Sequence, residues 1–305
     1  MAPGRERRMQ TSSGEIRLRA IGDITEATRL VELQREIWGY GRPDTDFPHP
    51  ARALFAISQS GGHVAAAFLD NLAVGLSLAW IGMEPVSQKP YLHSQLVGVL
   101  EEYRHHGIGY YLKLYQRDFA LENGMDLVKW TFDPMRSANA NLNLRKLGAV
   151  IKTYLPDYYG KVQSDFSHGL ATDRVWAEWH VASERVQRRL TNPPPPLDQE
   201  PRLMQLTNLA EDDEGMQRLV DYQLRQSEPR LLIEVPDDFE AICQRSMSLA
   251  QDWQSKIREI FQHYLSRGYT AADFLILSGS PRRAFYLLSS DPRSGSSVSA
   301  NGSRL

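Results

Sequence analysis

The sequence contains very little cysteine: Cys243 is the single cysteine among 305 residues. One thiol can form neither an internal disulfide nor a cysteine-rich zinc site, and such scarcity is typical of a reducing compartment. The chain also lacks an apolar run near the roughly 20 residues that a membrane-spanning helix needs. Because the basic, polar start has no apolar segment, no secretory signal is expected and the predicted location is cytoplasmic.

An excess of charge of one sign is missing as well. Lys and Arg number 35 against 37 Asp and Glu, which gives a net charge of −2. This balance argues against a chain that coats nucleic acid or another polyanion, so neither a nucleic acid nor a membrane is predicted as a partner. His, Cys, Asp and Glu show no metal-ligand spacing, and no metal is predicted.

A run of four prolines occurs once, in the segment TNPPPPLDQEP at residues 191–201. Four consecutive prolines favour a stiff polyproline II linker and forbid a helix or a central strand. We therefore predict a main domain at residues 15–190, a linker at 191–201 and an accessory unit at 202–290. The ends, residues 1–14 and 291–305, lack periodicity and are predicted to be disordered.

Strand and helix patterns alternate in the main domain, which predicts a mixed α/β fold. The expected strands are residues 16–20, 63–69, 72–81, 91–100, 125–132 and 175–181, and the expected helices are 24–38, 107–123 and 137–147. Asp23 is the expected N-cap of the first helix, with Glu26 completing a capping box.

The accessory unit reads as a strand, a long helix and a hairpin. The strand is expected at residues 231–235, one helix from an N-cap at Asp237 or Asp238 to about residue 265, and the hairpin at 273–277 and 283–288. About 60 residues are few for independent stability, so this unit should dock on the main sheet or on a partner subunit of a homodimer. It either shapes the acceptor pocket or acts as a structural brace.

The most informative motif follows the strand at residues 91–100. There Arg104-x-x-Gly107-x-Gly109 opens a helix, and we call residues 104–110 the cradle. Glycines allow a close backbone approach, and the N–H groups at a helix start lack intrahelical partners, so this pattern suits a pyrophosphate. The alternative is a plain strand–helix turn that happens to contain glycine. The pattern is neither the dinucleotide fingerprint nor a P-loop.

The stretch Val97-Gly-Val-x-x-x-Tyr103-Arg104-x-x-Gly107-Ile108-Gly109 resembles motif A of the GNAT superfamily of acyl-CoA-dependent N-acyltransferases. Further runs resemble a subgroup of predicted acetyltransferases with a carboxy-terminal extension: His93-Ser94, Trp130 to Pro134, Tyr154 to Gly160 and Thr172 to Arg174. The resemblance implies a GNAT-like mixed sheet flanked by helices, with acetyl-CoA or another acyl-CoA as co-substrate.

By this resemblance the cofactor-binding residues are Leu96, Val97, Val99, Arg104, His105, His106, Gly107, Ile108, Gly109, Tyr110 and Asn139. The strand backbone would pair with pantetheine, and the cradle would hold the pyrophosphate. A bulge at Gly98 would let a backbone N–H polarise the thioester oxygen. Leu144 stands where many members have the tyrosine that protonates the departing thiolate.

The candidate catalytic residues are His93, Asp133 and Tyr154. His93 is expected to share a strand face with Gln95, Val97 and Val99 and to act as the base, with a pKa near 6.5. Tyr154, with neighbouring tyrosines, can replace the missing acid, and Asp133 can position an amine. The alternatives are a buried histidine, a packed aromatic and a carboxylate that caps the turn before Pro134.

The resulting prediction is an N-acyltransferase that moves an acetyl or other short acyl group, such as succinyl, to a primary amine of a small molecule. The amine attacks directly, because Cys243 lies outside the motif region. The competing prediction is a CoA-binding module that has lost catalysis, which the leucine at position 144 favours.

Overall fold

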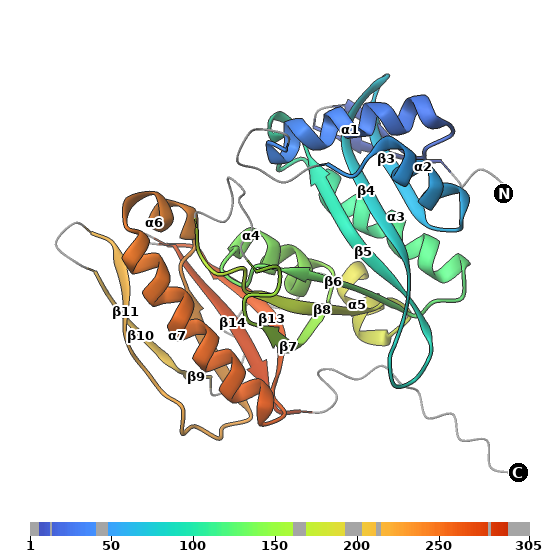
Figure 1. Ribbon diagram of the computed structural model, residues 1–305. Coiled ribbons are helices and arrows are strands. Elements are labelled where there is room, and N and C mark those ends of the chain that lie inside the picture. The colour runs from blue at the N-terminus through green and yellow to red at the C-terminus, as the bar shows by residue number, and fades with distance from the viewer. Residues whose placement is uncertain are drawn as a thin grey trace, which may run out of the picture. The chain divides into compact units, whose positions relative to one another are not determined.

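The chain forms two compact units in a computed structural model that describes residues 6–12, 14–40, 48–160, 169–192, 203–211, 215–279 and 282–291 (Figure 1). The first unit comprises Met1–Trp130 with Val162–Gly169, and the second comprises Thr131–Lys161 with Leu170–Leu305. The division therefore falls near Trp130, whereas the sequence predicted it at the proline-rich segment. Of that segment, residues 193–201 lie outside the described residues.

The first unit is a sheet with helices on both faces. Its elements are β1 (Arg7–Thr11), β2 (Gly14–Ala20), α1 (Ile24–Trp38), α2 (Ala51–Gln59), β3 (His63–Leu69), β4 (Leu72–Met83), β5 (Pro90–Val99), a 3₁₀ turn (Glu101–Tyr103), α3 (Ile108–Glu122) and β6 (Leu127–Phe132). The strands follow this order across the sheet. All neighbouring pairs are antiparallel except β5 and β6. The predicted mixed α/β class is confirmed.

Two apolar clusters hold these layers together. On one face α1 and α2 bury Leu30 and Leu54 against Leu76 and Leu78 of β4. On the other face Ile108, Leu112 and Tyr115 of α3 pack against β2, β3 and β4. Burial of side chains of this size stabilises each layer by about 1.5–3 kcal/mol per residue.

The N-cap of α1 is confirmed in a modified form. The Asp23 carboxylate accepts the Glu26 N–H at 2.9 Å, as predicted. The Glu26 carboxylate accepts the N–H of Gly22 at 2.7 Å and pairs with Arg19. The capping box therefore closes on the residue before the N-cap, which satisfies one more backbone donor at the helix start.

Strand β1 corrects the prediction that residues 1–14 are disordered. Arg7–Thr11 pairs antiparallel with β2, and Arg7 forms an ion pair with Asp118 of α3. The strand is polar and mostly exposed, so composition alone does not reveal it. The strand is ordered because its backbone forms hydrogen bonds with the edge of β2.

The second unit contains a second set of strands. Its elements are α4 (Ser137–Ala140), which continues as a π-helix (Asn141–Lys146), then β7 (Val150–Leu155), β8 (Arg174–His180), α5 (Glu184–Thr191), β9 (Met204–Gln205), β10 (Thr207–Glu211), β11 (Gln217–Tyr222), β12 (Arg230–Val235), α6 (Phe239–Arg245), α7 (Met247–Ser266), β13 (Thr270–Leu277) and β14 (Arg283–Ser289). The strand order is β8-β7-β13-β14-β12-β9, and β10 pairs with β11 as a separate hairpin.

The accessory strands continue a sheet that begins with earlier residues. Ala271 of β13 pairs with Ile151 of β7, and β13 and β14 form the predicted hairpin. Strands β13 and β14 therefore extend the sheet that contains β7 and β8. Strands β7, β9, β10 and β11, and helices α2 and α5, were not predicted.

The single helix predicted from about residue 238 to residue 265 is two helices, α6 and α7, in the structure. Asp238 caps α6 by accepting the Ala241 N–H at 3.0 Å, as predicted, but the helix ends at Arg245. Ser246 then adopts extended backbone angles and accepts the Leu249 N–H at 3.3 Å. A serine that caps a new helix start explains the break, which an unbroken apolar periodicity conceals.

Candidate functional site

Strand β5 carries a β-bulge at Gln95. The β4–β5 register pairs Leu78 with Leu96 and Ala79 with Ser94, which leaves Gln95 as the extra residue. The predicted bulge at Gly98 is therefore wrong. A Cβ atom at Gly98 would lie 2.6 Å from the Trp38 ring, so glycine is required there for the close packing of α1.

The bulge changes which side chains share a face of β5. His93 and Gln95 lie on one face, with His93 Nε2 and Gln95 Oε1 3.2 Å apart. Val97 and Val99 pack in the cluster on the α3 face, whereas Trp80, which stacks on His93, packs in the α1 cluster. The predicted common face of His93, Val97 and Val99 is wrong, because the extra residue inverts the alternation.

The second edge of β5 is only partly paired. Toward β4 the strand is paired from Pro90 to Val99. Toward β6 the parallel pairing joins Leu92 to Val128 and His93 to Lys129. In the described chain this leaves the β6-facing edge beyond the bulge available for an extended ligand, the kind of edge that accepts a strand-like group.

The turn after β5 has the geometry that the motif predicted. The 3₁₀ turn is followed by Arg104, and His105 and Gly107 have φ angles of 67° and 81°. Such angles favour glycine, and they turn the chain sharply into α3 at Ile108. The side chain of Arg104 is exposed, and its Nε donates to the Val99 carbonyl at 3.3 Å.

The start of α3 leaves its backbone donors without a side-chain cap. The N-cap residue is Gly107, which has no side chain to cap the first turn, and the first helical bond runs from the Tyr111 N–H to the Gly107 carbonyl. Helices α1, α5, α6 and α7 are each capped by an Asp or Ser side chain, whereas α2 and α4, like α3, have no side-chain cap. The N–H groups of Ile108, Gly109 and Tyr110 therefore have no intrahelical acceptor, which favours an anion at this point.

Gly109 keeps the space above these donors clear. Its backbone is an ordinary helix, and an added Cβ would meet only Val99 Cγ2, at 4.0 Å. Neither the fold nor the packing therefore requires glycine at this position.

The predicted cofactor residues divide between the two units. Leu96, Val97, Val99 and residues 104–110 lie in one strand–turn–helix segment of the first unit. His105 is exposed, and His106 Nδ1 lies 2.5 Å from the Ser12 hydroxyl. Asn139 is an exposed residue of α4 in the second unit.

His93 is a half-buried histidine stacked on an indole. Its ring centroid lies 5.2 Å from that of Trp80. Burial is the main cause that lowers its pKa below the ordinary value, and the charges of Lys113 and Lys129 act in the same direction. The imidazole is therefore neutral at pH 7 and able to accept a proton. The expectation of an ordinary pKa is corrected.

Asp133 and Tyr154 belong to the second unit, and each has its own partners. The Asp133 carboxylate accepts the Met135 N–H at 2.9 Å, which is the turn-capping alternative, and burial raises its pKa. The Tyr154 hydroxyl donates to Asp173 at 2.6 Å. Burial and the Asp173 charge raise the pKa of Tyr154. The tyrosine therefore keeps its proton, which it donates in the hydrogen bond to Asp173.

Sequence reasoning missed a buried polar cluster on α3. Lys113 Nζ donates to Ser94 Oγ at 2.8 Å, and Ser94 donates to Gln116 Oε1 at 2.8 Å. A lysine on a helix is ordinarily taken as exposed. The available signal was spacing, because Gly109, Lys113, Gln116 and Ala120 recur as a helical stripe beside the apolar one.

Over the described ranges no group of three His, Cys, Asp or Glu side chains is placed to hold a metal ion. In the same part of the chain no helix has both the length and the apolar character to cross a membrane.

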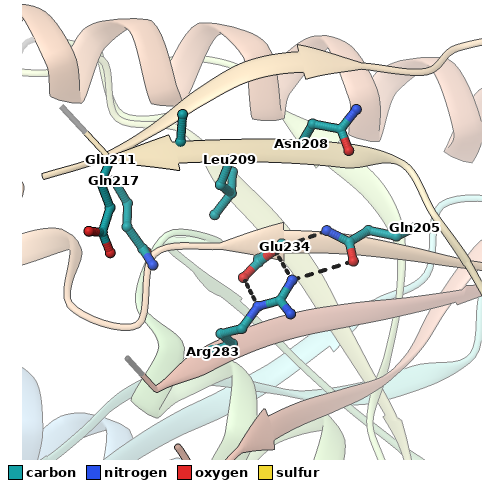
Figure 2. Close-up of a pocket in the computed structure, with 8 residues that line it drawn as sticks. Gln205, Asn208, Leu209, Glu211, Gln217, Glu234 and Arg283 are labelled. Atoms are coloured by element: carbon teal, nitrogen blue, oxygen red, sulfur yellow. Dashed lines mark hydrogen bonds and ion pairs between the residues drawn. The ribbon is translucent and has the colours of Figure 1, made fainter. Parts of the chain in front are cut away.

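A polar pocket lies in the second unit, between the β10–β11 hairpin and strands β12 and β14. It has a volume of about 280 Å³. Figure 2 shows the buried Glu234 bound by Arg283, with Gln205 completing the cluster. Arg283 Nε and Nη2 donate to the two carboxylate oxygens at 2.6 and 2.7 Å. Both oxygens of Glu234 are thus engaged, which indicates a structural ion pair.

This ion pair predicts a difference between two adjacent arginines. Arg283→Met should lower the free energy of unfolding by about 3 kcal/mol, because it leaves the Glu234 charge buried and unpaired. Arg282→Met should change it by less than about 1 kcal/mol, because the Arg282–Asp237 pair is at the surface. Urea denaturation of both variants measures this. Equal losses would contradict the assignment.

Comparison with known proteins gives matches to solved structures only. No protein-family model matches the chain, and no curated protein matches it. A GNAT-family acetyltransferase from Streptococcus pneumoniae is 14% identical, with 53% of this chain and 97% of that chain covered and a TM-score of 0.43. RimJ of Mycobacterium smegmatis, solved with CoA-disulfide, is 16% identical, with 58% and 89% covered and a TM-score of 0.43.

A third similar structure acts on a protein according to its name. It is the ribosomal-protein-S18-alanine N-acetyltransferase of Escherichia coli, 11% identical, with 54% of this chain and 94% of that chain covered and a TM-score of 0.42. Each of these three alignments covers a little over half of this chain.

Proposed function

We propose that this chain is an acyl-CoA-dependent N-acyltransferase whose cradle holds the pyrophosphate of CoA. The observation that carries the proposal is the start of α3. Its first-turn N–H groups have no side-chain cap, and Gly109 leaves the space beside them open. An uncapped helix start with room for a ligand is suited to phosphate. Arg104, exposed at the same turn, adds a cation that can pair with it.

Strand β5 would hold the rest of the co-substrate. Its β6-facing edge beyond the bulge can pair with the amides of pantetheine. The bulge at Gln95 displaces backbone N–H groups from the regular ladder, and one of them can donate to the thioester oxygen. The proposal therefore assigns to the bulge at Gln95 the role in polarising the thioester that was predicted for a bulge at Gly98.

His93 is the base that we assign. The neutral imidazole takes a proton from the attacking amine as the new C–N bond forms and the C–S bond to CoA breaks. Asp133 and Tyr154 remain proposed as positioning and acid groups, although both have partners of their own. Cys243 is buried, and burial raises the pKa of its thiol to about 11, which favours direct transfer over a cysteine-bound intermediate.

The proposed acceptor is a primary amine of a small molecule such as an amino acid, and the proposed acyl group is acetyl or succinyl. Since one similar structure is a protein N-acetyltransferase by name, peptide amino termini belong in the same test. A second candidate is a CoA-binding module without catalysis. It is favoured by Leu144, which is fully buried and apolar where a tyrosine acid was expected.

The test combines binding with turnover. Calorimetry with acetyl-CoA and succinyl-CoA should show binding, and thiol release with a panel of amines and peptides should show turnover. Arg104→Ala should weaken binding about tenfold or more, through the loss of a charge-assisted hydrogen bond. Arg35→Ala, an exposed arginine of α1, should not.

Each outcome separates the candidates. No binding of either acyl-CoA would reject the proposal. Binding without turnover on the whole panel would favour the module instead.

A further inference from the structure

Lys113 is a lysine buried between α3 and the sheet. It is 4% exposed, and its Nζ lies 3.5 Å from the centroid of the Trp130 ring. Among the described residues it forms no ion pair with a carboxylate; its hydrogen-bond partner is Ser94 Oγ, at 2.8 Å. Burying an amine in this way costs stability that an apolar side chain would not lose.

Burial disfavours the charged form of this amine. Burial lowers the pKa of Lys113 well below its ordinary value. The titratable group beside it on the α3 face is His63 of β3, and burial lowers the pKa of that histidine. Gln116 accepts from Ser94 through Oε1, and its buried Nε2 has no hydrogen-bond partner among the residues that the structure describes. A cluster that serves packing alone would not retain an unpaired buried donor.

The position of the cluster suggests its role. Ser94 directly precedes the bulged residue Gln95. Lys113 lies one helical turn after Gly109, on the helix whose first turn forms the cradle. Ser94 therefore joins the bulge of β5 to the helix that begins at the cradle through two side-chain hydrogen bonds, one from Lys113 and one to Gln116.

We propose that Lys113 is a positioning residue that fixes the β5 bulge relative to the start of α3 through its hydrogen bond to Ser94. This inference rests on the proposed function. The cradle fixes one end of the acyl-CoA, and the bulge supplies the donor to the thioester at the other end. A fixed spacing between them holds the thioester carbon where the amine can attack it.

The test is Lys113→Met, which keeps the length of the side chain and removes the amine. Because a buried amine is replaced by an apolar group, the melting temperature should stay the same or rise. The dissociation constant for acetyl-CoA should change less than about twofold, whereas kcat should fall about tenfold to a hundredfold, the effect of a small misplacement of reacting groups. Ser94→Ala should lower kcat in the same direction. Lys89→Met, at an exposed loop position, should leave kcat unchanged.

The outcomes distinguish this inference from the proposed function. An unmodified protein without binding or turnover would overturn both. An active unmodified protein whose kcat survives in Lys113→Met would overturn the positioning role alone. Loss of CoA affinity with kcat retained would also overturn it. If Lys113→Met does not fold, the kcat of Ser94→Ala decides in the same way.

Discussion

Replacing Gly109 with alanine is expected to weaken acyl-CoA binding about tenfold to a hundredfold without loss of stability. The added methyl group would lie in open space in the protein, 4.0 Å from Val99 Cγ2. Alanine is also favoured over glycine in a helix by about 1 kcal/mol. Bound phosphate would meet the methyl group, however, and overpacking of this kind costs about 1–3 kcal/mol.

Calorimetry and thermal unfolding of the same variant measure the two effects. Gly22→Ala is the matched control. Gly22 lies just before Asp23, the N-cap of α1, and an added Cβ atom would make only an ordinary contact with Glu26, at 3.7 Å. The control should bind acyl-CoA as the unmodified protein does. Full affinity in Gly109→Ala would show that no phosphate approaches this helix start.

The largest loss of stability is expected from Arg258→Met in the second unit. Asp173 is 1% exposed, and Arg258 binds it with two hydrogen bonds of 2.8 Å. Tyr154 and the Asp157 N–H complete its partners. Removing the arginine leaves a buried charge without its counterion, which should lower the free energy of unfolding by about 3–5 kcal/mol.

A double variant separates the charge from the packing. Adding Asp173→Asn to Arg258→Met removes the unpaired charge, so the double variant should unfold at a higher urea concentration than Arg258→Met alone. A loss below about 1 kcal/mol in Arg258→Met would show that solvent reaches Asp173 and that the network contributes little.

The sequence predicts the fold well where periodicity and turn chemistry agree. The strand–turn–helix at residues 91–123, the cap at Asp23 and the hairpin after Gly268 all appear as expected. β1 was missed because a polar edge strand has no apolar alternation, and its order depends on β2. The break at Ser246 was missed because serine is tolerated inside helices as well as at their starts.

The details of the candidate site depend on register, which a sequence does not contain. A bulge at Gln95 and one at Gly98 are compatible with the same alternation of residues in β5. The position of the bulge decides whether His93 lies on the same face of β5 as Val97 and Val99, because one inserted residue inverts the alternation of side chains. Lys113 was passed over for a related reason, since its burial follows from how α3 is rotated on the sheet and not from its residue type.

The pairing of β7 with β13 has a consequence for how the protein is made. Ile151 meets Ala271, about 120 residues later in the chain, so β7 leaves the ribosome long before its partner exists. At about 5–20 residues per second the delay is several seconds to tens of seconds. During that time one edge of β7 offers unpaired backbone groups to any neighbouring nascent chain. The second unit should therefore fold late and after translation, and a chaperone that covers exposed strand edges should increase its yield.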